Sequence, residues 1–374
     1  MWHSLRQELR QLIANKWDLA MVTLAPLFVI LLFTSMFSAG KAEHLPIAVI
    51  DQDHSDLSRS IENRINLNHS LSVYRISENQ QEIEQLLNAT KIWGYIHIPA
   101  GAENRLVNAQ DAQISIAYNQ SFFSIGNTIS SAMMTSAIGG MAEFGGENYL
   151  EQTIPYLNIP TPHIKISVLY NPDMSYEFYL EPFVVMAVLH LLLCCCVAFS
   201  TGQLLTATAK SSVWVTIFSK SLLYCGIFLF WTWLWMFWLV EIRGWFIAGQ
   251  LSLILLGQFL LYLAYALLAI LLVMATKNLS KTFGIIAVYG GSSLSFAGVT
   301  LPLNNAPLFT KFWANIIPYT AYAKLQTEQW VVGSPLWVSL QPLALLVIYV
   351  LLYAALAAFF LKKYWKTNLK EGQS

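Results

Sequence analysis

The chain has 374 residues, of which 56% are hydrophobic and 11% are charged, and its formal net charge is zero. Soluble domains carry about 25% charged residues, so this composition excludes an ordinary soluble protein and indicates an integral membrane protein. The basic residues form no cluster suited to nucleic acid, which argues against a nucleic-acid partner.

Six apolar segments define the expected membrane part. Each approaches the ~20 residues that a helix needs to cross the hydrocarbon layer, and none contains Asp, Glu, Lys or Arg. Proteins that move ions usually keep some charge inside the membrane. We therefore expect another subunit to supply the energy, unless the chain transports nothing. The six predicted transmembrane helices are residues 19–39, 183–201, 221–240, 251–275, 282–299 and 342–361.

Charges outside these segments are distributed unevenly. Of the 21 acidic residues, 16 lie between Lys41 and Glu181, whereas most Lys and Arg lie in the segments on the same side as the N-terminus. This positive-inside bias predicts that both termini are cytoplasmic and that the insert after the first span lies outside. The first span is long for a cleaved signal peptide, so we expect a retained anchor.

Residues 1–18 are predicted to form a separate amphipathic helix in the cytoplasmic interface. Leu5, Leu9 and Leu12 recur at helical spacing on one face, while Arg6 and Arg10 lie on the other. Such a pattern is typical of helices that lie at the level of the lipid headgroups. The alternative is a plain extension of the first span (residues 19–39), which would leave the leucines in water.

Residues 40–181 are predicted to form an inserted extracytoplasmic α/β domain. Segments rich in Ile, Val and Tyr alternate with helical patterns, which favours βαβ units and a mainly parallel sheet. At about 140 residues, the insert is large enough for a core of its own. The expected strands are 47–51, 71–77, 92–98, 113–118 and 164–170, and the expected helices are 57–67, 79–89, 102–109 and 122–141.

One motif in the insert resembles a calcium loop. The residues that match positions 1, 3, 5 and 12 of the template are Asp51, Asp53, Ser55 and Glu62. The glycine of the template is replaced by Asp56, and Arg59 would bring a cation to a cation site. The better interpretation is a strand end followed by a helix that Ser55 or Asp56 caps, with calcium binding as the weaker alternative.

The motifs of self-contained enzymes are absent from the sequence. There is no GxxxxGK[ST] phosphate loop, no HExxH and no GxSxG, and the four cysteines fall inside predicted spans without a metal-binding spacing. His190 in the second span has no titratable partner in the spans, so a packed neutral histidine is the better interpretation than a proton relay. We expect no catalytic site, metal or cofactor in this chain.

The order of these parts resembles that of the membrane subunits of ABC-2 type exporters, in the bacterial branch with a large outer domain between the first two spans. The match covers essentially the whole chain in order. The residues that carry it are Glu8-Leu9 with Asp18 and Pro26, the stretch 47–55 with Leu57-Ser58, the stretch 168–172, and Gly298, Pro302, Pro307 and Pro318-Tyr319.

The resemblance implies an α-helical integral membrane protein of the bacterial inner membrane, with six transmembrane helices and the inserted α/β domain. Residues 182–374 would form a five-helix transmembrane domain with an outer helical hairpin at about 301–341 and a cytoplasmic tail. The family pairs two such permeases, identical or homologous, with a separate ATPase that holds ATP and Mg²⁺, and it allows a periplasmic adaptor. The direction implied is export, of drug-like or lipid-like molecules.

The resemblance also suggests which segment contacts the ATPase. The linker between the second and third spans is the cytoplasmic linker long enough for a docking helix, although a solvated basic loop is the alternative. It lacks the Glu-rich entry and the Thr-Pro step of many relatives, which leaves the details of the contact open. The predicted coupling residues are Gly202, Gln203, Leu204, Leu205, Thr206, Lys210, Trp214 and Lys220.

Two further sets of residues are candidates for the transport pathway. The outer segment 301–341 is rich in Pro and aromatic residues. We expect it to cover the outer end of the pathway as a roof; the alternative is a plain interfacial aromatic belt. The candidate roof residues are Trp313, Pro318 and Tyr319. Because the spans lack charge, an apolar or amphiphilic substrate is expected. The candidate wall positions, each also compatible with ordinary packing, are Met21, Phe28, Phe33, Val185 and His190.

Two other classes of function compete with an ATP-driven exporter. An ion-coupled secondary transporter would need intramembrane charge, which the predicted spans lack. A non-transporting receptor or assembly platform that presents the outer domain is the second alternative. An ATPase encoded beside this chain would distinguish both from the exporter.

Overall fold

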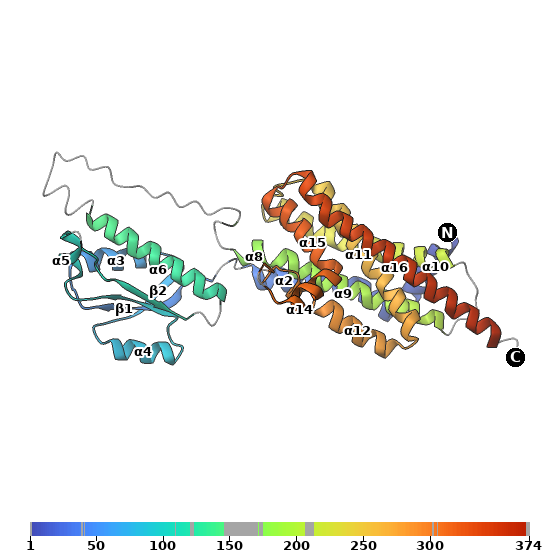
Figure 1. Cartoon of the computed structure of the whole chain (residues 1–374), viewed down its shortest axis with the longest axis horizontal. Helices are drawn as coiled ribbons and strands as arrows, with labels where there is room; N and C mark the ends of the chain where they lie inside the picture. The colour runs from blue at the N-terminus through green and yellow to red at the C-terminus, as the bar shows by residue number, and fades with distance from the viewer. Residues whose placement is uncertain are drawn as a thin grey trace. The chain divides into compact units, whose positions relative to one another are not determined.

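The computed structural model describes residues 2–38, 40, 42–108, 110–119, 123–145, 171, 175–205, 213–300, 303–304 and 306–371. The chain divides into two compact units. The membrane unit comprises Met1–Ser38 and Leu169–Ser374, and the α/β unit comprises Ala39–Val168. Figure 1 shows the helices of the first and the sheet of the second.

Within the described ranges, five helices of the membrane unit are long and apolar enough to cross a membrane. All five extend beyond at least one end of their predicted spans. The third continues into a π-helical turn, η3 (Trp238–Ile242), and the last is 36 residues long. The five helices are α2 (Lys16–Phe37), α9 (Glu181–Gly202), α10 (Val213–Phe237), α11 (Leu251–Thr276) and α16 (Leu336–Glu371).

The predicted span at 282–299 is not one continuous helix. The structure has a 13-residue helix there, α12 (Leu279–Gly291), followed by the single turn α13 (Ser293–Phe296). The break follows from Gly290-Gly291, because glycine is a poor helix former. The close packing also requires Gly290, since a Cβ at this position would lie 2.7 Å from the Leu191 side chain on α9.

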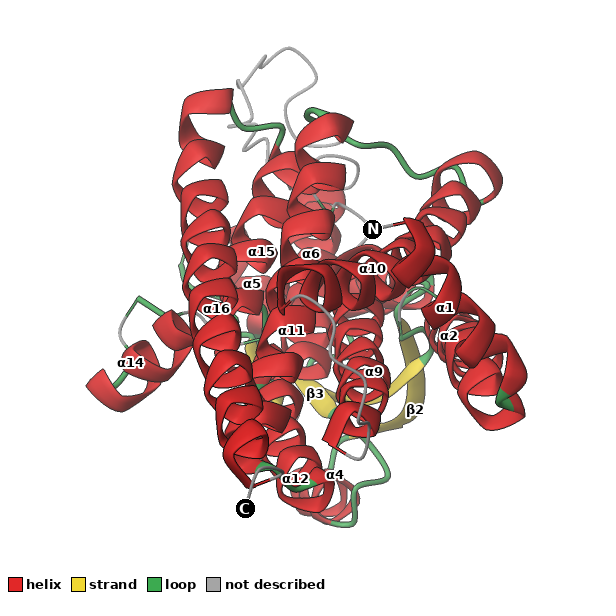
Figure 2. Cartoon of the chain, turned by 90° about the vertical axis from the view of Figure 1, so that its right-hand side faces the viewer, coloured by secondary structure: helices red, strands yellow, loops and turns green. Residues whose placement is uncertain are grey.

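The helices α9 and α11 form the centre of the membrane unit. About 72% of each is buried, against 11% of α2 and 28% of α16, and Figure 2 shows these two helices between α2 on one side and α16 on the other. The outer faces of α2 and α16 remain apolar, with Phe28, Leu31 and Leu351 each at least 60% exposed. Such faces are stable only against lipid or another protein chain.

The amphipathic helix α1 (Trp2–Ala14) is separate from α2. Asn15 lies between them in an extended conformation, and its side chain accepts a hydrogen bond from the Trp17 backbone N–H at the start of α2. The membrane helix thus begins at Lys16, three residues before the predicted first span at 19–39. Leu12 of α1 is 4% exposed and belongs to the main core of the membrane unit.

The α/β unit contains a four-stranded sheet of order β2-β1-β3-β4. The strand β1 pairs in parallel with both neighbours, whereas β4 runs antiparallel to β3. These strands overlap the first four predicted ones; the expected strand at 164–170 lies outside the described residues. The strand bounds are β1 (Leu45–Asp51), β2 (Leu71–Ser77), β3 (Gly94–Ile98) and β4 (Ser115–Tyr118).

Helices pack on the sheet over two separate cores. The larger core joins the sheet to the helices α3 (Asp56–Asn66), α5 (Ala102–Val107) and α6 (Phe123–Glu143). The smaller core places Ile83 of α4 (Gln80–Asn88) against Ala48 and Ile50. Because β1 is buried through both cores, its sequence is a continuous apolar run rather than an alternating one.

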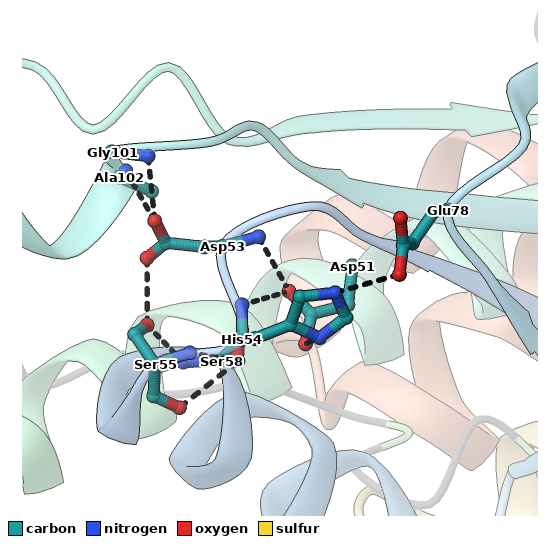
Figure 3. A network of polar contacts seen from close by, with 8 residues as sticks. All are labelled: Asp51, Asp53, His54, Ser55, Ser58, Glu78, Gly101 and Ala102. Atoms are coloured by element: carbon teal, nitrogen blue, oxygen red, sulfur yellow. Dashed lines mark hydrogen bonds and ion pairs between the residues drawn. The ribbon is translucent and has the colours of Figure 1, made fainter.

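The calcium-like motif holds two loops together instead (Figure 3). The Asp53 carboxylate accepts hydrogen bonds from the backbone N–H groups of Gly101 (2.6 Å), Ala102 (3.1 Å) and Glu103 (2.9 Å), at the start of α5. In return, the Glu103 carboxylate accepts one from the Leu57 N–H at the start of α3 (3.1 Å). Asp53, which follows β1, therefore caps α5, and Glu103 in the first turn of α5 caps α3.

The same motif also caps α3, the helix that follows it, as the capping interpretation of the sequence predicts. Ser55 is the N-cap of α3 and forms a reciprocal capping box with Ser58. The Asp51 carboxylate accepts hydrogen bonds from the N–H groups of Asp53 (3.0 Å) and His54 (3.1 Å). Among the described residues, no group of His, Cys, Asp or Glu side chains is arranged to hold a metal ion.

We predict that Asp53→Asn loosens the start of α5. Partial burial opposes ionisation of Asp53, but the hydrogen bonds from Ser55 and from the three backbone N–H groups outweigh it and lower the pKa of this carboxyl. Losing the charge should cost about 1–2 kcal/mol of local stability at neutral pH. Hydrogen–deuterium exchange of the full chain should show faster exchange at Gly101–Glu103, whereas Asp56→Asn, at an exposed pair with Arg59, should change nothing there.

The pH dependence has a definite sign. A carboxyl whose pKa is lower in the folded state stabilises it above the unfolded pKa of about 4, and this contribution is lost as the pH falls through the folded pKa. After correction for intrinsic exchange rates, the wild type should lose protection at residues 101–103 below about pH 4, and Asp53→Asn should not. Equal acid sensitivity in both proteins would refute the role of Asp53.

Candidate functional site

The predicted coupling segment is described in part. Gly202 is the last residue of α9, and the residues 203–205 form a single 3₁₀ turn, η2 (Gln203–Leu205). Thr206 and Lys210 lie outside the described residues, and the chain resumes in α10, where Trp214 is 46% exposed. The Leu205 carbonyl accepts a hydrogen bond from the Tyr364 hydroxyl of α16 (2.9 Å), which fixes η2 to the end of the last helix.

The sequence pattern assigns Lys220 to a cytoplasmic loop, but the structure places it inside α10, where it is 1% exposed. The physical reason is that buried acceptors surround its ammonium group. Its Nζ donates to Glu8 Oε2 of α1 (2.9 Å), to the Ser200 carbonyl of α9 (3.1 Å) and to Ser200 Oγ (2.7 Å). We name Glu8, Ser200 and Lys220 the α1 junction.

The α1 junction connects three helices that are far apart in the sequence. A second contact, from Ser4 Oγ to Ser219 Oγ (3.0 Å), reinforces the link between α1 and α10. All three ammonium protons of Lys220 have acceptors, so the cost of burying its charge is offset as far as geometry allows. Because α9 and α10 flank the predicted coupling segment, the α1 junction links both ends of that segment to α1.

An apolar cavity lies beside the α1 junction. Its volume is about 240 Å³, and it opens between α1, α2, α9, α10 and α12. Tyr224 lines the cavity and also interacts with Ser200 of the α1 junction. The lining is aromatic and aliphatic apart from one carboxylate, that of Asp18; it includes Leu12, Trp17, Met21, Phe199 and Phe283.

The structure does not bring the predicted pathway residues together. Met21 lines the cavity, but Phe28 is 65% exposed on the outer face of α2. Phe33 stacks on Phe37 of the same helix, with 6.3 Å between ring centroids. Val185 is wholly buried within the bundle. These four residues therefore do not form one continuous wall.

His190 is packed between two tyrosine rings in the centre of the bundle. Its ring centroid lies 4.2 Å from that of Tyr265 on α11 and 5.2 Å from that of Tyr319. Its Nδ1 lies 3.0 Å from the Met186 carbonyl, one turn earlier on α9. No ionisable carboxylate or cation pairs with it among the described residues, so the surroundings are those of a packing residue.

The candidate roof residues anchor two short helices, α14 (Leu308–Ile316) and α15 (Pro318–Gln326). Pro318 is the first residue of α15 and separates the two, as proline does at a helix start. The Tyr319 hydroxyl donates to the Phe183 carbonyl of α9 (2.5 Å), and Trp313 Nε1 donates to Ser292 Oγ (3.2 Å). Both helices are thus held against the bundle.

Sequence reasoning missed a buried acid at the α15 end of the bundle. Glu181, assigned to the end of the outer insert, is the first residue of α9 and is wholly buried. Its Oε1 accepts hydrogen bonds from Thr34 Oγ1 (2.8 Å) and Trp235 Nε1 (3.1 Å). Pro182 was the available signal, because proline favours the first turn of a helix and places the start of the span at Glu181.

Comparison with known families agrees with this arrangement. A family described as ABC-2 family transporter protein matches residues 16–359. The chain therefore belongs to the ABC-2 transporter family: it is a multi-pass membrane permease, a component of an ABC transporter that has no ATPase site of its own and works with an ABC ATPase subunit. No curated protein matches the chain.

We predict that the α1 junction stabilises the membrane unit. Lys220→Met leaves Glu8 without its cation in a nearly buried site, which should cost about 3–5 kcal/mol. The double variant Glu8→Gln/Lys220→Met should recover much of this loss, because neither partner is then left charged. Thermal unfolding of the detergent-purified chain measures both, with the exposed Lys281→Met as control. Purely additive effects of the two substitutions would show that the pair is not coupled.

Proposed function

We propose that this chain is the permease of an ATP-driven exporter that moves an apolar or amphiphilic molecule out of the cytoplasm or the inner leaflet. The observation that carries the proposal is the α1 junction. It joins both ends of the segment expected to contact the ATPase to the helix that precedes the first span. ATP-driven movement of that segment would then shift α1, α9 and α10 together.

The positions of the charges support an amphiphilic substrate. Glu8, Asp18 and Lys220 lie at one end of the bundle, and Glu181 lies at the other, in the first turn of α9. Between these ends, α9 and α11 present mainly apolar and aromatic side chains. A fully hydrophilic ion would meet no fixed counter-charge there. The buried charges lie at the two ends of the bundle and are engaged in hydrogen bonds with neighbouring helices, which gives no support to an ion-coupled carrier.

The assembly that we propose contains two permeases and two ATPase subunits. The apolar outer faces of α2 and α16 are exposed in the single chain, and a second copy or a homologue would bury part of them. The remainder would face lipid of the bacterial inner membrane. ATP and Mg²⁺ would bind to the ATPase subunits, and a periplasmic adaptor could contact the α/β unit.

The proposed topology places both termini in the cytoplasm and the α/β unit outside. We predict that, in a cysteine-free background, a single cysteine at Asn79 reacts with a membrane-impermeant maleimide in intact cells, whereas one at Asn368 reacts only after lysis. Asn79 is exposed at the start of α4, so its labelling is not limited by burial. Labelling of Asn368 from outside would contradict the orientation.

Coupling is tested with the partner ATPase. The chain alone, in lipid, should hydrolyse no ATP above background. Replacing residues 204–210 by a Gly/Ser linker should abolish co-purification of the ATPase and ATP-dependent transport. The same replacement at residues 108–111, in the α/β unit, should leave both unchanged. Full ATPase occupancy with the 204–210 linker would show that this segment is not the main docking element.

A further inference from the structure

We propose that the cavity beside the α1 junction is a binding site for lipophilic cations, with Asp18 as the counter-charge of the ligand. The proposal rests on the proposed export function and narrows its substrate class from amphiphiles in general to amphiphiles that carry a positive charge. The occupant is a small molecule with an apolar body and an amine, quaternary ammonium or phosphonium group.

The walls of the cavity fit the apolar body. Met21 and Cys196 supply polarisable sulfur, and Trp17, Tyr224 and Phe283 supply aromatic surface. Methionine adapts to ligands of different shape, since its side chain is unbranched and flexible. A volume of about 240 Å³, open at one side, accommodates a molecule of several rings or a short alkyl chain.

The charge of the cavity decides the sign of the ligand. The Asp18 carboxylate accepts one hydrogen bond, from Asn15 Nδ2 (3.0 Å), and forms no ion pair with any described residue. In contrast, Glu8 pairs with Lys220, and Glu177 pairs with Arg243. Asp18 is therefore an acid in an apolar wall whose partner is a neutral amide. A ligand cation would supply the opposite charge, and the neighbouring aromatic faces would add cation–π attraction.

A ligand bound in the cavity would contact a residue that is linked to the α1 junction. Tyr224 lines the cavity and interacts with Ser200, whose hydroxyl accepts a hydrogen bond from Lys220. A ligand that displaces the Tyr224 ring would thus disturb the α1 junction through one side chain. This is a direct contact path from a substrate to the helices that flank the coupling segment.

The test is a binding measurement on the detergent-purified full chain, without ATPase. Radiolabelled tetraphenylphosphonium is the probe in equilibrium dialysis, and tetraphenylborate, an anion of nearly the same shape, is dialysed in a separate experiment because the two ions precipitate each other. The wild type should bind the cation at least ten-fold more tightly than the borate. Asp18→Asn keeps the size of the side chain and an acceptor for Asn15, and it should weaken binding about ten-fold.

Two further variants separate charge from shape. Met21→Trp should also reduce binding, because it fills the cavity, whereas Glu84→Gln, which changes the net charge equally on the exposed surface of α4, should bind as the wild type does. Each variant is first shown to elute and melt as the wild type does. If Asp18→Asn fails to fold, the separately measured affinities for the cation and the borate, together with Met21→Trp, decide the question.

Wild-type affinity for the cation in Asp18→Asn, or equal wild-type affinities for the cation and for tetraphenylborate, would overturn the proposal and indicate apolar partitioning alone. Because no ATP is hydrolysed in this assay, its failure leaves the coupling role of residues 204–210 untouched. Conversely, a permease that fails to bind its ATPase could still show charge-selective binding here.

Discussion

The organisation of the membrane unit depends on how a buried ammonium group is satisfied. Lys220 cannot lie 1% exposed in an apolar bundle unless all its protons find acceptors. Glu8 and the Ser200 carbonyl and hydroxyl provide them, from two other helices. The positions of α1, α9 and α10 are consequently interdependent at this end, because moving one of these helices would leave a charge without its partner.

The same constraint explains where the other charges of the membrane unit lie. Glu181 uses side chains of α2 and α10, and Arg243 pairs with Glu177 at the same end of the bundle. Charges at the two ends connect helices, while the centre relies on apolar packing and on tyrosine hydroxyls. Among the described residues that line the apolar cavity beside the α1 junction, Asp18 supplies the one carboxylate, and we propose that it pairs with a ligand cation.

The α/β unit solves a similar problem with backbone groups. Its β1 and β3 strands end in loops whose free N–H groups need acceptors, and Asp53 and Glu103 exchange them between the two loops. These hydrogen bonds hold the carboxyl ends of β1 and β3 together.

The membrane class, most helix positions and the first four strands follow from the sequence by itself, because apolar length and periodicity are local properties. The Asp51–Ser55 stretch likewise shows a strand end and a helix cap, since capping involves near neighbours. Only the tertiary structure decided the close approach of Leu191 to Gly290 and the burial of Lys220 and Glu181. A charge near the end of an apolar segment lies in a loop or inside a helix according to whether acceptors from distant helices reach it. Glu8 is 212 residues away from Lys220, and no local pattern records that contact.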